Sequence, residues 1–468
     1  MLEVIILAAG KGTRMRSAIP KVLHKLAGKP LLEHVVATAR NLSPTKIHIV
    51  VGHGAEQVAA AVAGDDVAFH KQQNQLGTGH AVAQALPECD PASTVLILFG
   101  DVPLMSTKTL RSLLASTTVA SSVDASSVSA PSVDAPSVLA AHIPDPTGYG
   151  RVIRDAHQRF VEIVEEKDAS EKQRAVQEVN TGVIAAPASL LTTLLSRVNN
   201  QNAQAEYYLP DVLGLAREDG MTVNVVVSED PVEILGVNNR LQLEKLERIL
   251  QERLAEELLL DGVAVADRRR LDIRGQLTCG EGVSIDINVV LEGDITLDDN
   301  VSIGANCVIR DANIGANTVI QPFSHIESAV IGTDCSIGPY ARLRPGTDLG
   351  PGVRIGNFVE TKNSTLGAGS KANHLAYIGD TTVGEGSNIG AGTITCNYDG
   401  ANKFPTHLGD RVFIGSNSTL VAPVTIADGG FVAAGSVITK DVPTDDLAVG
   451  RAKQRNISGW QKPTKKEQ

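Results

Sequence analysis

The sequence has 468 residues, 20% of them charged, and a net charge of -11 at pH 7. At about 100 to 200 residues per domain this length predicts two to four domains. The acidic balance excludes an overall basic field of the kind that nonspecific nucleic-acid binding uses, so any phosphate recognition must be local.

The cysteines predict neither a disulfide framework nor a zinc site, because they lie far apart without a CxxC spacing. They are Cys89, Cys279, Cys307, Cys335 and Cys396. No run approaches about 18 consecutive apolar residues, and no basic segment precedes the first apolar run. We therefore expect a cytoplasmic protein with reduced thiols and with neither a membrane nor a nucleic-acid partner.

The first apolar run, VIILAA at 4–9, is followed by a glycine-rich basic loop. Gly10 and Gly12 remove side chains from the turn, and Lys11, Arg14 and Lys21 add positive charge, so backbone N–H groups and cations can approach a polyphosphate. The loop is neither a Walker A motif nor a complete GxGxxG. A tight turn with solvated lysines is the alternative.

Further apolar runs at 46–52, 94–100 and 222–227 alternate with helix-like segments as far as residue 238. Continuous Val, Ile and Leu runs between helices favour parallel strands that are buried on both faces. The pattern predicts a Rossmann-like α/β domain over 1–238. Within it, the Ser/Ala-rich stretch 115–138 is low in complexity and predicts a surface loop between a helix and the strand VLAAHI.

Residues 239–260 predict an amphipathic connecting helix, because Leu243, Leu246, Leu250 and Leu254 recur at steps of three and four. A coiled coil is a weaker interpretation, since the segment is too short for sustained heptads.

After residue 261 the apolar residues recur every six positions. The period includes Val283, Val289, Ile295 and Val301, each followed two places later by Ile285, Leu291, Leu297 and Ile303. Six residues make one short strand and one turn, and three such units close a triangular coil, so the array at 263–440 predicts about ten stacked coils of about 18 residues. The pattern resembles the left-handed parallel β-helix of hexapeptide acyltransferases, and the predicted domain covers 261–468.

The loop motif LAAGKGTRM, with Pro20 and Lys21, resembles the signature of sugar-nucleotide pyrophosphorylases. Other pieces of this signature are QLGTGHA, FGDVPL, PTGYGR, IVEEKDA, EVNTG, NAQAEYYLPD and GVNNR. The second half adds NFVETK, SKANHLAYIGD and NIGAGTITCNYDG. Together they resemble, over nearly the full length, the bacterial family of bifunctional enzymes that acetylate glucosamine-1-phosphate and then uridylylate N-acetylglucosamine-1-phosphate to make UDP-N-acetylglucosamine.

For the first half, the resemblance implies a UTP and sugar-nucleotide site. Leu7, Ala8, Ala9 and Gly10 would contact uridine, Gln72, Gly77 and Thr78 would complete uracil recognition, and Arg14 and Lys21 would stabilise the phosphates. Phe99 and Gly100 precede Asp101, which would bind Mg²⁺ together with Asn238. Gly150, Glu165 and Asn180 would hold the sugar. Phe99 departs from the family, which implies Tyr there, and Glu165 is ambiguous because Glu162 and Glu166 lie beside it.

For the second half, the resemblance implies His374 as general base, oriented by Glu360. Arg344, Lys362, Tyr377, Asn388 and Lys403 would bind glucosamine-1-phosphate. Ala391, Asn397, Tyr398, Ser416, Ala434 and Arg451 would bind acetyl-coenzyme A. The stretch NYDGANKFPTH from Asn397 breaks the period and predicts a loop ejected from the coils. The family also implies a homotrimer whose acetyl sites are shared between neighbours.

Two other functions fit parts of this pattern. A sugar-1-phosphate nucleotidyltransferase with a non-catalytic β-helix platform would not need His374, NYDG and Arg451 together. A scaffold with a degenerate nucleotide-binding domain predicts the loss of Arg14, Lys21 or Asp101, and all three are present.

Overall fold

The computed structural model describes residues 1–10, 12–117 and 135–465, and two compact units divide at Leu250 and Gln251. The division lies inside helix α8 (Arg240–Leu260). Lys11 and most of the Ser/Ala-rich stretch lie outside the described residues. The ends of that stretch are regular, contrary to the predicted loop over 115–138, because Ala115 belongs to helix α4 (Thr107–Ser116) and Val138 to strand β7 (Ser137–His142).

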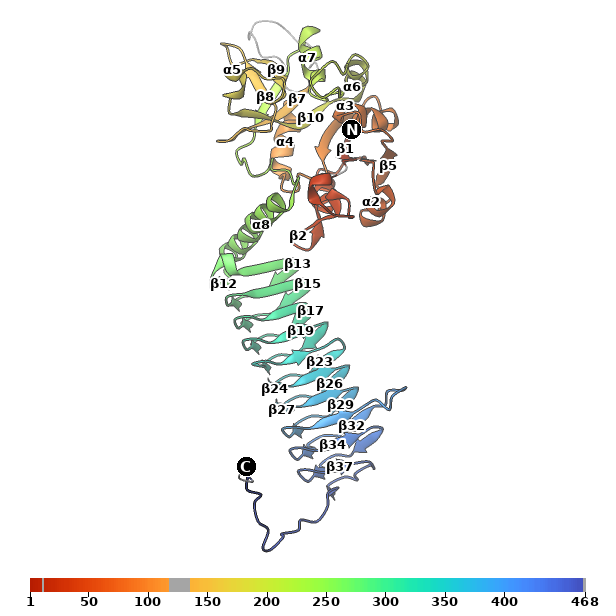
Figure 1. Cartoon of the computed structure of the whole chain (residues 1–468), viewed down its shortest axis with the longest axis vertical. Coiled ribbons are helices and arrows are strands. Elements are labelled where there is room, and N and C mark those ends of the chain that lie inside the picture. The colour runs from red at the N-terminus through yellow and green to blue at the C-terminus, as the bar shows by residue number, and fades with distance from the viewer. Residues whose placement is uncertain (11, 118–134, 466–468) are drawn as a thin grey trace. The chain divides into compact units, whose positions relative to one another are not determined.

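The first unit is built on a nine-stranded sheet with the order β11-β7-β10-β6-β1-β4-β5, and β8 and β9 extend it from β10 (Figure 1). Its other strands are β1 (Leu2–Ala8), β4 (Lys46–Val51), β5 (Val67–Lys71), β6 (Thr94–Phe99), β8 (Arg151–Arg154), β9 (Phe160–Val164), β10 (Glu178–Pro187) and β11 (Asn224–Val227). A two-stranded ribbon joins β2 (Lys25–Leu26) to β3 (Lys29–Pro30).

The four apolar runs correspond to β1, β4, β6 and β11, and each of these strands has a parallel neighbour. Burial on both faces is confirmed for β1, β4 and β6, whereas β11 is a half-buried edge strand. The sheet is mixed, since β10 runs antiparallel to β6 and β7. The remaining helices of this unit are α1 (Leu31–Arg40), α2 (Ala55–Ala61), α3 (Thr78–Ala85), α5 (Glu171–Arg174), α6 (Ala188–Leu195) and α7 (Asp211–Glu218). Short 3-10 helices are η1 (Thr13–Met15), η2 (Lys21–Leu23) and η3 (Leu86–Glu88).

Each face of the sheet has its own core because successive side chains of a strand point to opposite sides. Ile5 packs with α3, α6 and α7 residues on one face, and Ile6 packs with α1 and α4 residues on the other. The carboxyl ends of β1 and β6 lie at the same edge of the sheet, because the two strands are parallel and Leu7 pairs with Phe99. Open α/β sheets bind their ligands at such ends.

The second unit is a parallel β-helix whose coils stack one on the next (Figure 1). One face is an 11-stranded parallel sheet, and ten of its strands lie within 263–440, where about ten coils were predicted. Its strands are β12 (Ala264–Val265), β14 (Ser284–Ile285), β16 (Ser302–Ile303), β18 (Val319–Ile320), β21 (Ser336–Ile337), β24 (Arg354–Asn357), β27 (Lys371–His374), β30 (Asn388–Ile389), β33 (Phe413–Ile414), β36 (Phe431–Val432) and β38 (Leu447–Ala448).

A 16-stranded sheet forms the rest of the coils. Its strands are β13 (Leu271–Cys279), β15 (Val289–Leu297), β17 (Val308–Ile314), β19 (His325–Glu327), β20 (Ala329–Ile331), β22 (Arg342–Leu343), β23 (Thr347–Leu349), β25 (Glu360–Lys362), β26 (Ser364–Leu366), β28 (Tyr377–Gly379), β29 (Thr381–Val383), β31 (Ile394–Cys396), β32 (Thr406–Leu408), β34 (Thr419–Val421), β35 (Val424–Ile426) and β37 (Val437–Ile438). After Arg268–Arg270, a 3-10 turn named η4, the chain enters β13.

The six-residue period is confirmed at its inward positions, where all eight residues from Val283 to Ile303 that defined it are at most 3% exposed. The ejected loop is also found, between β31 and β32, and Tyr398 and Lys403 pair across it. Helix α8 is amphipathic as expected: Leu246 is buried with Met15, Leu26 and Val237 in the first unit. Of the helices that the structure describes, none is both long and apolar enough to span a membrane.

Candidate active sites

A cleft in the first unit opens at the carboxyl ends of β1 and β6. The sequence-predicted residues among those that line it are Leu7, Ala8, Ala9, Gly10, Lys21, Gln72, Gly77, Thr78, Phe99 and Asp101. Gly100 is not among the lining residues, and its N–H instead donates to the carbonyl of Leu7 at 3.0 Å. This hydrogen bond fixes the end of β6 against the end of β1, which positions Asp101 at the cleft.

The basic loop folds over the same strand ends. Gly12 has a φ of 58°, and a Cβ there would lie 2.7 Å from the Cβ of Lys21, so only glycine lets the loop pass this close. The Lys21 ammonium donates to the Asp101 carboxylate and, at 3.2 Å, to the amide oxygen of Asn238. Arg14 donates to the same amide oxygen at 3.1 Å. Two cationic donors, Arg14 and Lys21, thus meet two oxygen acceptors, those of Asp101 and Asn238.

A second pocket adjoins the cleft and shares Thr78, Phe99 and Glu206 with it. The predicted sugar residues Gly150, Glu165 and Asn180 all line it. The N–H of Asn180 donates to the carbonyl of Gly150 at 2.8 Å, and Asn180 Oδ1 accepts from the N–H of Gly182 at 2.9 Å. A register shift between β10 and β7 follows Asn180, and β-bulges of this kind redirect side chains next to functional sites.

The three neighbouring glutamates occupy different environments. Glu166 forms an ion pair with the buried Arg151 at 2.7 Å, and Glu162 accepts from Gln173 at 3.4 Å. Glu165 lines the pocket, where burial first and then the carboxylate of Asp211 raise its pKa. Of the three, Glu165 is the one that a sugar hydroxyl in this pocket could reach.

In the β-helix, His374 is held by a residue that the sequence analysis did not select. His374 Nδ1 lies 2.7 Å from Oδ1 of Asn357, which is its register partner one coil earlier. Because an amide oxygen only accepts, Nδ1 is the donor in this contact, and in the neutral ring the lone pair is then on Nε2. The expected contact from Glu360 is not found, since this carboxylate accepts from Arg344 at 2.8 Å.

Three predicted phosphate ligands gather close to one another on the same part of the β-helix. The ammonium of Lys403, in the ejected loop, lowers the pKa of Lys362, and the charge of Arg344 adds to this effect. Repelling cations that stay together at the surface favour an anion as their ligand. Tyr377 is the register partner of Glu360, and Asn388 is the partner of Lys371.

The predicted acetyl-coenzyme A residues follow one corner of the coils. Ala372, Ile389, Ile414 and Val432 are paired in register from coil to coil. His374, Ala391, Ser416 and Ala434 each come two residues later, so they form one column along the corner.

Of the remaining predicted acetyl-coenzyme A residues, Arg451 contacts this column, and Asn397 and Tyr398 lie in the ejected loop between β31 and β32. Arg451 donates to the carbonyl of Ala434 at 2.6 Å. Asn397 donates to Asp380, and the Tyr398 hydroxyl donates to the carbonyl of Gly400 at 2.5 Å in the ejected loop. Tyr398 is 60% exposed and therefore free to contact a ligand.

Sequence reasoning missed Asn357 and Glu206, and simple signals could have found both. Asn357 precedes His374 by 17 residues, the length of one coil. The residue one coil before a candidate base is its neighbour in the stack, so this spacing could have identified Asn357. Glu206 stands in the quoted segment NAQAEYYLPD and lines both pockets.

Two family models match the chain, one in each half. The MobA-like NTP transferase domain matches residues 4–172. The bacterial transferase hexapeptide (six repeats) model matches residues 278–311, 311–344, 328–363 and 405–440.

Curated relatives match both halves together. The bifunctional protein GlmU of Cupriavidus pinatubonensis is 54% identical over 99% of this chain and 99% of its own length. The bifunctional protein GlmU of Stutzerimonas stutzeri is 53% identical over 99% of this chain and 100% of its own length. The protein of the same name from Ralstonia nicotianae is 54% identical over 100% of this chain and 99% of its own length.

Identity at this level through both halves is not what a nucleotidyltransferase on an inert platform or a degenerate scaffold would give. The chain therefore belongs to the family of bifunctional GlmU proteins, enzymes with a uridylyltransferase half and an acetyltransferase half that serve the synthesis of UDP-N-acetylglucosamine.

Proposed function

We propose that the two sites act in sequence within one cytoplasmic enzyme. The β-helix site transfers the acetyl group of acetyl-coenzyme A to the amine of glucosamine-1-phosphate. The cleft of the first unit then joins the resulting N-acetylglucosamine-1-phosphate to UMP from UTP, and pyrophosphate leaves. Two observations carry this proposal: the convergence of Arg14, Lys21, Asp101 and Asn238 in one unit, and in the other the His374–Asn357 contact together with a cluster of three cations.

For uridylyl transfer, the sugar phosphate must attack the α-phosphorus of UTP while the bond to the β-phosphate oxygen breaks. Leu7 to Gly10, with Gln72, Gly77 and Thr78, would hold the uridine end, and Glu165 and Asn180 would hold the sugar next to it. Lys21 and Arg14 would stabilise the charge on the phosphates and on the pyrophosphate that leaves. Because the two pockets adjoin, the acceptor phosphate and the UTP phosphates can be held in line.

The residues present fit a magnesium ion. One cation, the Lys21 ammonium, already contacts an oxygen of Asp101 and an oxygen of Asn238, so both oxygens can face a single positive charge. A carboxylate and an amide oxygen are ligands that Mg²⁺ prefers, with water and phosphate completing the octahedron. When bound, Mg²⁺ supplies charge neutralisation on the triphosphate. Displacement of Lys21 from Asp101 would leave its ammonium free for phosphate.

For acetyl transfer, His374 Nε2 would take a proton from the amine as that nitrogen attacks the thioester carbonyl, and coenzyme A would leave as its thiol. Asn357 holds Nδ1 and so fixes the tautomer that the base needs. Arg344, Lys362 and Lys403 would bind the sugar phosphate, with Tyr377 and Asn388 on its hydroxyls, and Glu360 would orient Arg344. Ala391, Asn397, Tyr398, Ser416, Ala434 and Arg451 would hold acetyl-coenzyme A along the corner that begins at His374.

The same corner carries an exposed apolar ridge that supports a homotrimer. Phe323, Tyr340, Phe358 and Leu375 follow one another from coil to coil and are 47–60% exposed, and the rings stack with centroid distances of 4.9 and 5.3 Å. Phe358 and Leu375 directly follow Asn357 and His374 in the sequence. A neighbouring copy that covered this ridge would also cover the acetyl site, as the family implies.

Sedimentation equilibrium should therefore give a mass of about three times the 49.2 kDa of one chain. Phe358→Glu should lower this mass and acetyl transfer together while uridylyl transfer persists. Val330→Glu, at a position 50% exposed on another face, is the matched control and should stay trimeric. A wild-type monomer with full acetyl transfer would contradict the proposal.

Substitution of Gly182 tests whether the second pocket binds the sugar. Its φ is 80°, and a Cβ there would lie 2.6 Å from Cε2 of Phe99, so alanine must displace the aromatic wall shared by both pockets. We expect Gly182→Ala to lower kcat/KM for N-acetylglucosamine-1-phosphate by about tenfold or more, because a displaced Phe99 ring shifts the bound sugar out of line with the UTP phosphates. Gly220→Ala has nearly the same φ, 81°, with nothing within 4 Å, and should leave it unchanged. Equal losses in the two variants would show that strain, and not the pocket, is responsible.

The two activities can be assayed separately in the full-length protein. Acetyl transfer is followed as free thiol from acetyl-coenzyme A with glucosamine-1-phosphate and without UTP. Uridylyl transfer is followed as pyrophosphate from UTP with N-acetylglucosamine-1-phosphate. Absence of thiol release would remove the acetyltransferase half of the proposal, and absence of pyrophosphate would remove the other half.

A further inference from the structure

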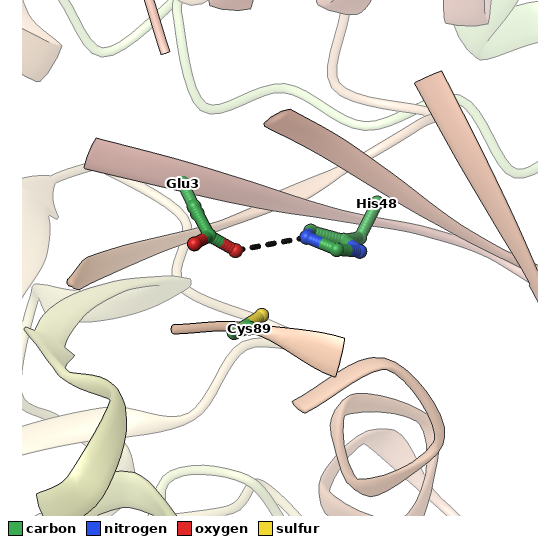
Figure 2. A group of neighbouring side chains, drawn as sticks. All are labelled: Glu3, His48 and Cys89. Carbon is green, nitrogen blue, oxygen red and sulfur yellow. Dashed lines mark hydrogen bonds and ion pairs between the residues drawn. The ribbon is translucent and has the colours of Figure 1, made fainter. Parts of the chain in front are cut away.

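A cluster of three buried side chains in the first unit takes no part in either reaction. Glu3 lies near the amino end of β1, His48 on β4, and Cys89 directly after η3. Figure 2 shows the Glu3 carboxylate and the His48 imidazole directed at each other, with the Cys89 sulfur beside them. Each of the three residues is at most 6% exposed.

The cluster is separate from the nucleotide cleft. The cleft begins at Leu7, four residues further along β1 than Glu3, which corresponds to about 13 Å at a rise of about 3.3 Å per residue. His48 and Cys89 are also absent from the cleft lining. A role for these side chains must therefore be sought outside the uridylyl transfer chemistry.

The three side chains bring possible metal ligands close together. One oxygen of Glu3, one ring nitrogen of His48 and the sulfur of Cys89 all lie within 4.8 Å of one another. Bonds of about 2.0 to 2.3 Å to a tetrahedral Zn²⁺ place ligand atoms about 3.3 to 3.8 Å apart, so small side-chain rotations would bring the three onto one ion. We propose that Glu3, His48 and Cys89 bind a structural Zn²⁺ that ties β1, β4 and the segment before β6 together.

The chemistry of the donors selects zinc over the magnesium of the cleft. A thiolate and an imidazole suit Zn²⁺, whereas Mg²⁺ takes oxygen ligands. Burial and the nearby Glu3 carboxylate raise the pKa of Cys89 to about 12, so the metal-free thiol is protonated. Zinc binding releases that proton to solvent, and the two negative charges of thiolate and carboxylate then neutralise the ion.

Outer contacts already orient two of the ligands. His48 Nε2 lies 2.9 Å from Glu3 Oε2, while Nδ1 lies 2.9 Å from Nε2 of His70 on β5. With zinc bound, Nε2 would face the metal, and Nδ1 would donate its proton to His70 Nε2, which would hold the ring in place. The other Glu3 oxygen accepts from the N–H of Asp90 at 3.0 Å, which fixes the carboxylate. The cysteine spacing predicted no zinc site because each ligand comes from a different element.

The test is metal uptake by the full-length chain after it has been stripped with a chelator. Equilibrium dialysis against Zn²⁺ should give about one tightly held ion per chain, and Co²⁺ should give a thiolate-to-cobalt absorption band. Cys89→Ser and His48→Gln should lose the ion and the band. Cys279→Ser, the same change at a free, half-buried cysteine of the β-helix, should keep both.

Folding of the variants is checked by uridylyl transfer in Mg²⁺ buffer, which uses none of the three residues. The stripped wild-type protein gives a second readout that needs no variant: zinc should raise the unfolding temperature of the first unit. The proposal would be overturned if the wild-type chain held no tightly bound Zn²⁺. It would also be overturned if Cys89→Ser still held one Zn²⁺ per chain. The cluster would then be a hydrogen-bonded network only.

Discussion

His374→Ala should reduce kcat for acetyl transfer by about 10² to 10⁴-fold, the usual contribution of a general base, and leave uridylyl transfer within about twofold. The reason is the free lone pair on Nε2, which is available because Nδ1–H donates to Asn357 at 2.7 Å. Thiol release from acetyl-coenzyme A measures the loss, and pyrophosphate release from UTP reports the other unit of the same preparation. Unchanged thiol release would remove His374 from the mechanism.

The positioning residue Asn357 can be separated from the base by the pH profile. Asn357→Asp places a carboxylate on Nδ1, which favours the imidazolium and raises the pKa of His374. The neutral base is then populated only at higher pH, so the low-pH limb of the kcat/KM profile should shift to higher pH. Asn313→Ala, an exposed asparagine of β17, should leave the profile unchanged. A purely structural role for Asn357 would lower the rate equally at every pH.

The fold was predictable wherever a simple period determines burial. Each six-residue unit directs an aliphatic side chain to the interior of the coil. The sequence alone therefore identified the buried positions from Val283 to Ile303. The antiparallel strand β10 was not predicted, because a buried antiparallel strand has the same apolar composition as a parallel one. Likewise, helix α4 continues to Ser116 and β7 begins at Ser137, since tertiary packing overrides the weak propensity of Ser-rich ends.

The candidate sites were predictable as sets of residues but not as sets of contacts. Motifs identified Gly150, Glu165 and Asn180, which line one pocket, and Arg344, Lys362 and Lys403, whose charges affect one another. They did not show that Glu360 faces Arg344 while Asn357 faces His374, because the motifs name residues and not their partners on the neighbouring coil. The zinc cluster was hidden for a related reason, since Glu3, His48 and Cys89 become neighbours only through the pairing of β1 with β4 and the packing of η3.

Asp101→Asn should reduce uridylyl transfer by at least about 10²-fold, because removal of one group that stabilises transition-state charge usually has an effect of this size, and it should leave acetyl transfer within about twofold. The carboxylate is the charged oxygen ligand that lies with Asn238 around the Lys21 ammonium, and it is also the ion-pair partner of Lys21. Its loss therefore removes the ion and leaves the Lys21 ammonium without its anionic partner. Pyrophosphate release at increasing Mg²⁺ concentration makes the measurement.

Asn238→Ala distinguishes metal binding from electrostatics alone. It keeps the Asp101 charge and removes only a neutral oxygen, so it should raise the Mg²⁺ concentration for half-maximal rate, with much of the rate recovered at high Mg²⁺. Asp66→Asn removes a surface carboxylate paired with Arg40 in the same unit and should change neither quantity, because exposed pairs contribute little. If Asp101→Asn retained wild-type rate and Mg²⁺ dependence, the convergence of Asp101 and Asn238 on Lys21 would be an ordinary salt-bridge network, and the metal would have to be held by the triphosphate alone.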